Sequence, residues 1–302
     1  MPARVSLVGP ALIVALAIGW GLNWPVMKIG LREFPLWTFR GSACLVSGLC
    51  LLAVAAMAGG RAMPRRGDWL ELSVAALFNV TLWQILIAYG LRLIASGEAA
   101  ILAFTMPLWA VLLSRLFLKE ALGRKGVAAL ILGSAGMAVL LSRDLTALAQ
   151  APTGVAMVLL GAFAWAVGTV LQKHQRMALT TIALAGWQLT LGALPMMAMV
   201  LLLEGARVPH VSEQAWLALA FTTFIALVLC WYLWFKIVAL MPAGLAAITT
   251  LLVPAVGVLG GALMLGETIG GREILALVLI AAALGLVLIR SAAPRRPADA
   301  AG

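Results

Sequence analysis

The amino-acid sequence predicts an all-α integral membrane protein, with ten transmembrane helices arranged as two inverted five-helix repeats. Three observations lead to this prediction: an apolar composition, ten apolar runs of membrane-spanning length, and residues that recur at a nearly constant offset. Of the 302 residues, 64% are hydrophobic and 11% are charged, and the mean hydropathy is +1.09. A soluble domain carries about 25% charged residues, and its core could not bury so many apolar side chains. The composition therefore excludes a soluble enzyme, a secreted disulfide scaffold and a nucleic-acid-binding module.

The predicted spans follow from the length of the apolar runs, because a helix that crosses a bilayer needs about 20 mostly apolar residues. Ten such runs are separated by short polar breaks. They cover residues 10–31, 36–58, 69–92, 97–118, 124–142, 153–172, 179–203, 214–238, 243–265 and 272–290. The first run is long, contains Asn23 and Lys28, and lacks a small-residue cleavage site, so we expect it to be a retained helix and not a signal peptide.

The basic residues predict how these spans are oriented. Lys and Arg number 21 against 11 acidic residues, which gives a net charge of +10. Most of the basic residues lie at the two termini and in the connections after spans 2, 4, 6 and 8, such as Arg61, Arg65 and Arg66. Because cytoplasmic loops carry the excess of Lys and Arg, we expect both termini in the cytoplasm. The charge then has a membrane explanation, with lipid as the partner and no nucleic acid.

Two halves of the chain share a pattern of prolines and glutamates. Pro107 precedes Glu120 by 13 residues, and Pro254 precedes Glu267 by the same 13, so that both pairs are related by an offset of 147. Chance could give one such match, so the inference of a repeat depends on further matches at nearly the same offset.

The start of each half carries a second match. Trp20 and Lys28 correspond to Trp165 and Lys173 at an offset of 145. We therefore divide the chain into a first five-helix repeat and a second five-helix repeat with a short cytoplasmic tail, residues 1–148 and 149–302. Five spans are an odd number, so the two halves enter the membrane in opposite directions. Such inverted repeats are typical of secondary transporters, whose substrate site lies near the midplane between the repeats.

Several motifs carry a resemblance to a known family. They are "GWGLNWPVMK", "FRGSACL", "AYGLRLIASGEAAIL", "TMPLWAVLLSRLFLKEALGRKGVAALILGSAGMAVLL" and "LLVPAVGVLGGALMLGETIGGREILALVLIAAALGLVLI". On these residues the chain resembles the EamA-type members of the drug/metabolite transporter superfamily over about 10–290. The resemblance implies a basket of ten helices in a bacterial inner membrane that exports metabolites. The chain is similar to members that export aromatic and other neutral amino acids.

Tryptophans and neutral polar residues near the middle of spans are the candidates for a transport pathway, because Trp otherwise gathers at the membrane interfaces. Trp20, Asn23 and Trp24 share one helical face, and Asn79 and Trp83 are four residues apart. We predict a central cavity with aromatic walls for a small neutral or zwitterionic metabolite. The candidate substrate-binding residues are Trp20, Asn23, Trp24, Asn79, Trp83, Thr105, Trp165, Thr169 and Thr249. The amides have an alternative role in hydrogen bonds between helices.

Four further residues are candidates for gating or for a hinge: Pro107, Pro254, Lys28 and Arg40. A proline inside a span removes one helical hydrogen bond and permits a bend, and a static kink is the alternative. Lys28 has the alternative role of an interfacial anchor. Arg40 lies about one turn inside its span, where a long side chain reaches the interface, and its alternative role is structural.

Catalysis and metal binding have no support in the sequence. The three cysteines lie in apolar runs without a CxxC pair, and the two histidines lie in polar connections, so we expect no metal site, no cofactor and no enzymatic activity. All eleven acidic residues lie at the ends of predicted spans or in loops, whereas a proton relay places a carboxylate inside the bundle. We therefore expect a facilitator, or weak coupling, in place of strict proton exchange.

The predicted function is secondary transport of small metabolites, most simply export of neutral or aromatic amino acids by alternating access. Two alternatives stay open at this stage. The same aromatic walls would serve a multidrug or lipophilic-compound exporter, and from a different class the chain would be a membrane scaffold or channel. A scaffold does not need mid-span tryptophans together with amides, and a channel would show flux without saturable counterflow. The natural substrate and the oligomeric state stay open.

Overall fold

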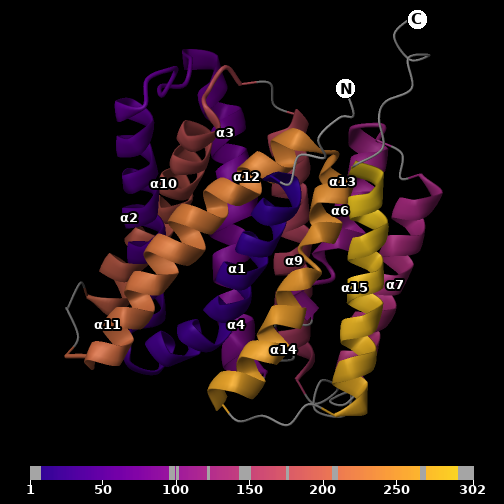
Figure 1. Ribbon diagram of the computed structural model, residues 1–302. Helices are drawn as coiled ribbons and strands as arrows, with labels where there is room; N and C mark the ends of the chain where they lie inside the picture. Colours follow the sequence, from indigo (N-terminus) through magenta and orange to yellow (C-terminus); the bar gives the residue numbers. More distant parts are fainter. Residues whose placement is uncertain are drawn as a thin grey trace, which may run out of the picture.

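A computed structural model describes residues 8–94, 99, 102–120, 123–142, 151–174, 177–205, 210–265 and 270–291. Over these ranges the regular structure is entirely helical, and they contain no β-strand. Helix occurs in every one of the ten apolar runs. Helices α1 and α9 run through the middle of the bundle, as Figure 1 shows, while α2 and α10 lie on one flank and α7 and α15 on the other.

The helices in chain order have the following bounds. The first half contains α1 (Val8–Glu33), α2 (Leu36–Met57), η1 (Arg66–Asp68), α3 (Trp69–Ala76), η2 (Leu77–Leu82), α4 (Trp83–Leu93), α6 (Met106–Phe117) and α7 (Arg124–Leu141). The second half contains α9 (Pro152–His174), α10 (Thr181–Met199), η3 (Val200–Glu204), α11 (Glu213–Ala220), η4 (Phe221–Leu229), α12 (Cys230–Leu240), α13 (Ala243–Thr249), α14 (Leu252–Leu265) and α15 (Gly271–Ser291).

Six of the described helical stretches are long and apolar enough to cross a membrane. They are Ala11–Glu33, Leu36–Met57, Arg66–Leu93, Pro152–Lys173, Thr181–Glu204 and Glu213–Leu240. Three shorter apolar helices, Met106–Phe117, Ala246–Gly257 and Ile274–Ala283, accompany them. Large apolar side chains also face outward, for example Leu201, Leu202 and Leu203, as expected of a surface that contacts lipid.

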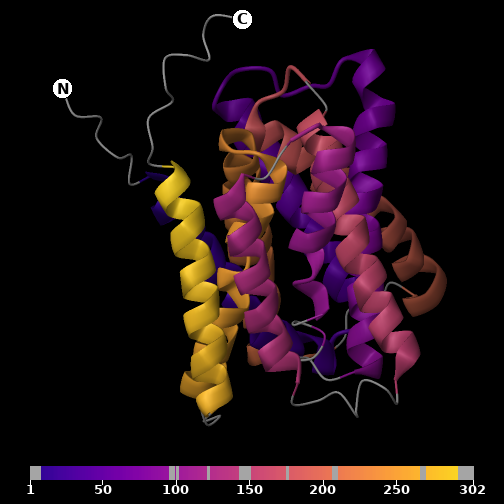
Figure 2. The ribbon, with the colours of Figure 1, turned by 90° about the vertical axis from the view of Figure 1, so that its right-hand side faces the viewer.

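Two helix pairs form the flanks of the bundle. Helix α2 packs along α10, and α7 packs along α15; Figure 2 shows the second pair side by side. Glycines permit the close approach of α2 and α10, because a Cβ atom on Gly48 would lie 2.6 Å from the Thr190 backbone nitrogen and 2.9 Å from the Gly186 carbonyl oxygen. Small residues at such crossings let helix backbones pack closely.

Two of the runs expected as single helices are broken. The first break, at Phe104 and Thr105, precedes α6, and the second, at Thr250 and Leu251, separates α13 from α14. At each threonine the backbone N–H bonds to the carbonyl three residues earlier, on Leu102 and Ala247, at 3.1 Å. A proline follows each break in the first turn of the next helix, where its missing N–H costs nothing. Pro107 and Pro254 therefore lie at helix starts and not inside continuous helices.

Three other long stretches contain a π-helical segment. Segment η3 forms the end of the stretch from Thr181 to Glu204, whereas η2 and η4 lie inside their stretches. Segment η2 interrupts the helix from Trp69 to Leu93, and η4 interrupts the helix from Glu213 to Leu240. π-helical segments are rare and often occur at functional sites. Segments η2 and η4 end directly before a helix, α4 or α12, that contributes side chains to the cavity described next.

Candidate substrate cavity

A cavity of about 70 Å³ lies between the helices of the two halves. The first half contributes Trp20, Asn23, Trp24 and Met27 from α1, Arg40 from α2, Trp83, Gln84 and Ile87 from α4, and Phe104 and Met106 around the first helix break. The second half contributes Trp165, Ala226, Leu227 and Trp231. The volume is below the roughly 300–1,000 Å³ of ordinary ligand pockets, so a larger solute requires the walls to move.

Tryptophans from four helices form the aromatic wall. The ring centroids of Trp165 and Trp234 are 4.6 Å apart, those of Trp20 and Trp234 are 5.9 Å apart, and those of Trp83 and Trp165 are 6.4 Å apart. These separations fall within the range in which aromatic pairs stabilise one another. The Trp20 indole Nε1–H also donates to the Ala226 carbonyl at 2.9 Å. The wall is thus held together by contacts between α1, α4, α9 and α12.

Asn23 lines the cavity and also joins the two halves. Its Oδ1 accepts a hydrogen bond from the Thr222 hydroxyl on η4 at 3.0 Å. Trp24, on the same helix, lies in the cavity, and its ring centroid is 6.3 Å from that of Phe104. Of the nine substrate-binding residues predicted from the sequence, the structure brings five to this cavity: Trp20, Asn23, Trp24, Trp83 and Trp165.

Asn79 lies elsewhere, in a contact that we call the α10 seam, made of Asn79, Thr81, Gln188 and Gly192. The Asn79 Nδ2 donates to the Gln188 Oε1 at 3.1 Å, and the Thr81 hydroxyl donates to the Gly192 carbonyl at 2.8 Å. Asn79 and Gln188 are fully buried. This is the helix–helix alternative that the sequence left open for the amides.

The three predicted threonines are also outside the cavity lining. The Thr105 hydroxyl donates to the Leu102 carbonyl at 2.8 Å, and the Thr249 hydroxyl donates to the Ala246 carbonyl at 2.7 Å. Both hydroxyls thus bond to their own helix. The Thr169 hydroxyl is buried and has no hydrogen-bond partner among the described residues.

Arg40 lies in the cavity lining with only 5% of its surface exposed. A carboxylate fixes the start of its helix: Glu204 accepts from the backbone N–H of Trp37 at 2.9 Å and of Thr38 at 2.7 Å, and from the Thr38 hydroxyl at 2.8 Å. An anion at a helix N-terminus satisfies unpaired N–H groups and the helix dipole. Glu204 therefore positions the first turn of α2, from which Arg40 reaches the cavity.

Gln84 is the polar cavity residue that the sequence argument missed. It is 2% exposed, lines the cavity, and its side chain hydrogen-bonds with the Cys44 thiol. The signal was available, since Gln84 is an amide within a span and directly follows Trp83. Met27, Ile87, Phe104, Met106 and Trp231 line the cavity too, but apolar residues within apolar runs carry no distinguishing signal.

The remaining gating candidates have different surroundings. The side chain of Lys28 lies outside the described residues, whereas its repeat counterpart Lys173 donates from Nζ to the Val238 carbonyl at 2.8 Å and the Met241 carbonyl at 3.1 Å. These carbonyls are at the C-terminal end of α12, where a cation is favourable. Pro107 and Pro254 are buried at their helix breaks.

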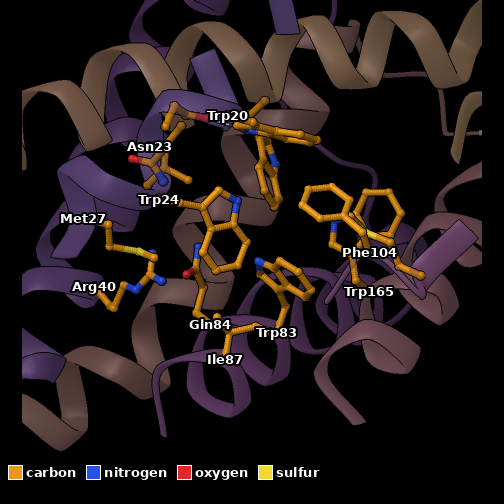
Figure 3. Close-up of a pocket in the computed structure, with 14 residues that line it drawn as sticks. Trp20, Asn23, Trp24, Met27, Arg40, Trp83, Gln84, Ile87, Phe104 and Trp165 are labelled. Atoms are coloured by element: carbon orange, nitrogen blue, oxygen red, sulfur yellow. Dashed lines mark hydrogen bonds between the residues drawn. The ribbon is translucent and has the colours of Figure 1, made fainter. Parts of the chain in front are cut away.

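The arrangement can bind a solute that has an apolar body and a polar end. Figure 3 shows Arg40 and Gln84 on the side of the cavity near Met27, and Phe104 and Trp165 on the other side. Trp24 lies between these two groups in the view. We call Arg40 and Gln84 the polar end of the cavity, and Phe104 and Trp165 its aromatic end. Within the described residues no Asp or Glu lines the cavity.

Comparison with known proteins identifies relatives over nearly the whole chain. The model of the EamA-like transporter family matches residues 7–142 and again 152–289. The chain is 30% identical to the uncharacterized transporter YvbV of Bacillus subtilis over 95% of this chain and 93% of the relative. It is 28% identical to a probable amino-acid metabolite efflux pump of Salmonella typhimurium over 90% and 92%. A solved crystal structure of a protein at 18% identity has the same fold, with a TM-score of 0.79 over 94% of this chain and 97% of that one.

Proposed function

This chain belongs to the EamA-like transporter family, within the drug/metabolite transporters, and we propose that it exports neutral or aromatic amino acids across the bacterial inner membrane. The observation that carries the proposal is the aromatic cavity between the two halves of the chain. Aromatic walls with a few polar groups suit a small solute with an apolar side chain. The relative from Salmonella typhimurium, named as a probable amino-acid metabolite efflux pump, supports the same cargo class.

We propose ten spans in two inverted repeats, 1–148 and 149–302, and the helix contacts support this symmetry. Helix α1 packs on α14 as its counterpart α9 packs on α6, and α4 packs on α9 as α12 packs on α1. The pairs α2 with α10 and α7 with α15 each join counterparts. Two separate matches to one family model add further support.

The orientation with both termini in the cytoplasm is part of the proposal. The start of α1 and the end of α15 lie at the same end of the bundle in both views (Figures 1 and 2). This placement agrees with an even number of spans. The excess of basic residues in the connections on that side supports its assignment to the cytoplasm.

The position of the cavity between the halves supports alternating access, because rocking one half against the other would expose a site at their interface to each side in turn. The breaks before Pro107 and Pro254 are proposed as the points at which α6 and α14 change their tilt. Lys28 and Arg40 are proposed to act at the periplasmic ends of α1 and α2. A second candidate, export of lipophilic or cationic drugs, is favoured by the same tryptophans but not by the Arg40 charge in the lining.

Counterflow in proteoliposomes tests the proposal. Vesicles are loaded with phenylalanine, leucine, a hexose or a lipophilic cation, and uptake of the labelled compound is measured without a pH gradient. Saturable counterflow of phenylalanine and leucine is expected. Counterflow of the lipophilic cation alone would favour the drug exporter, and linear, unsaturable flux would indicate a channel. A pH gradient that drives concentrative uptake would overturn the expectation of a facilitator.

A further inference from the structure

The polar end of the cavity holds a buried cation without an anion. Arg40 is 5% exposed, and its Nε has no hydrogen-bond acceptor among the residues that the structure describes. In the part of the chain that the structure describes, no carboxylate forms an ion pair with Arg40, and none lines the cavity. A buried charge is costly unless an opposite charge and hydrogen bonds compensate it. Among the described residues this cation therefore has no counter-anion, and a carboxylate on the cargo would supply one.

The same end of the cavity holds a buried acceptor without a donor. The Gln84 Oε1 is enclosed and has no hydrogen-bond partner within the described ranges. Its side chain bonds with the thiol of Cys44, one helical turn beyond Arg40 on α2, so the amide is held in place by the helix that carries the cation. A buried acceptor that lacks a donor costs free energy, and a cargo N–H group would satisfy it.

The aromatic end lies on the other side of Trp24 in Figure 3, where Phe104 and Trp165 are found. The lining thus places one cation donor and one amide acceptor together and leaves apolar rings for the rest of the solute. A guanidinium binds a carboxylate through two parallel N–H···O bonds. An α-amino acid presents a carboxylate, an ammonium and an apolar side chain in this arrangement.

We propose that Arg40 binds the carboxylate of an α-amino acid, that the Gln84 Oε1 accepts a hydrogen bond from its ammonium, and that its side chain lies toward Phe104 and Trp165. This assignment rests on the proposed transport function and specifies the cargo class for the same cavity. It makes the protein selective for zwitterions with an apolar side chain, and it disfavours cations that lack a carboxylate.

Three phenyl compounds test the contacts of Arg40 and Gln84 separately. Phenylalanine has both groups, phenylalanine amide lacks the carboxylate, and 3-phenylpropionate lacks the ammonium. Binding to the purified full-length protein is measured by titration calorimetry in detergent. The expected affinity for phenylalanine is about 10-fold or more above that for phenylalanine amide, because a hydrogen bond to a charged group is worth the most. The affinity for 3-phenylpropionate is expected to be intermediate.

Two variants assign these preferences to residues. Arg40→Gln is expected to weaken phenylalanine binding by about 10- to 100-fold and to abolish the preference over phenylalanine amide. Gln84→Leu is expected to abolish the preference for phenylalanine over 3-phenylpropionate and to retain the preference over the amide. Arg40→Lys keeps the charge but not the two-pronged donor, so its affinity should lie between that of Arg40→Gln and the wild type.

Arg32→Gln is the matched control, because Arg32 is an exposed arginine near the end of α1; its binding should equal that of the wild type. Equal wild-type affinity for phenylalanine and its amide would overturn the assignment, and so would an Arg40→Gln variant that keeps the wild-type preference. The three-compound comparison on the wild-type protein decides the matter if a variant does not fold. Failure of both phenylalanine and leucine counterflow refutes the proposed function, whereas counterflow that does not distinguish the carboxylate refutes only this assignment.

Discussion

Asn79 and Gln84 are two buried amides five residues apart on one continuous helical stretch, yet they have different surroundings. Asn79 bonds to Gln188 in the α10 seam and is not part of the cavity lining. Gln84 lines the cavity, and among the described residues the side-chain oxygens of both amides lack a donor. Burial and amide chemistry are shared, so they do not identify a binding residue. What distinguishes the two is that Gln84 faces a cavity and Asn79 faces another helix.

The largest expected effect concerns the aromatic wall. Trp165 is 1% exposed and stacks near Trp234, so Trp165→Ala should lower the free energy of unfolding by about 3–5 kcal/mol and abolish counterflow. Trp165→Phe keeps an aromatic ring and should retain most of the stability and most of the counterflow. Thermal melting in detergent and counterflow per folded molecule measure the two effects. Full counterflow by a folded Trp165→Ala variant would remove this residue from the pathway.

The α10 seam should respond in stability and not in cargo binding. Asn79→Leu leaves Gln188 buried without its partner, which should lower the free energy of unfolding by about 1–3 kcal/mol. The double variant Asn79→Leu/Gln188→Leu should recover much of this loss, because an apolar pair leaves no unsatisfied group. Phenylalanine affinity, measured by calorimetry, should stay at the wild-type value in both. A change in affinity without a change in melting temperature would contradict the distinction between seam and cavity.

A smaller effect is expected from Glu204, which is outside the cavity but holds the start of α2. Glu204→Gln removes the charge and one acceptor, so the free energy of unfolding should fall by about 0.5–2 kcal/mol. Phenylalanine affinity should fall by about 2- to 5-fold, because the helix turn that positions Arg40 is held less firmly. This loss is smaller than the roughly 1.4 kcal/mol that corresponds to a tenfold change in affinity. Glu213→Gln, at an exposed carboxylate, is the control. If the double variant Arg40→Gln/Glu204→Gln bound phenylalanine more weakly than Arg40→Gln alone, Glu204 would affect binding by a route other than positioning Arg40.

The smallest effect is expected at Thr249. Its hydroxyl bonds to the Ala246 carbonyl of its own helix and it does not line the cavity. Thr249→Val should therefore change the free energy of unfolding by about 1 kcal/mol or less and leave counterflow unchanged. A clear loss of phenylalanine counterflow in a stably folded variant would instead support the substrate-binding role that the sequence suggested.

The helices of this fold are predictable from the sequence because each apolar run is long and most runs are bounded by charged residues. The helix breaks at Thr105 and Thr250 are harder to predict, because Pro107 and Pro254 are equally compatible with a bend inside one continuous helix. The tryptophans of the cavity are predictable from their depth in the spans. The apolar lining residues Met27, Phe104 and Met106 are not, because tertiary packing alone separates them from ordinary core residues.

Asn79 was expected to share a helix face with Trp83 and to line the cavity, and the reason that it does not is specific. That expectation assumed 3.6 residues per turn. Residues 77–82 are π-helical, with hydrogen bonds from i to i+5, so residues four apart across this segment do not align as they do on an α-helix. Trp83 faces the cavity while Asn79 faces α10. No local sequence feature predicts the π-helical segment η2.

The π segments also bear on the ancestry of the chain. Segment η2, shifted by the repeat offset of 145, falls on residues 222–227, within η4 at Phe221–Leu229. A π turn accommodates an extra residue in a helix, and one residue corresponds to roughly 100° of rotation. Under the proposed duplication, a shared insertion in both halves is older than the duplication itself. Deleting one residue from 77–82 would restore an unbroken α-helix and turn Trp83 and Gln84 away from the cavity.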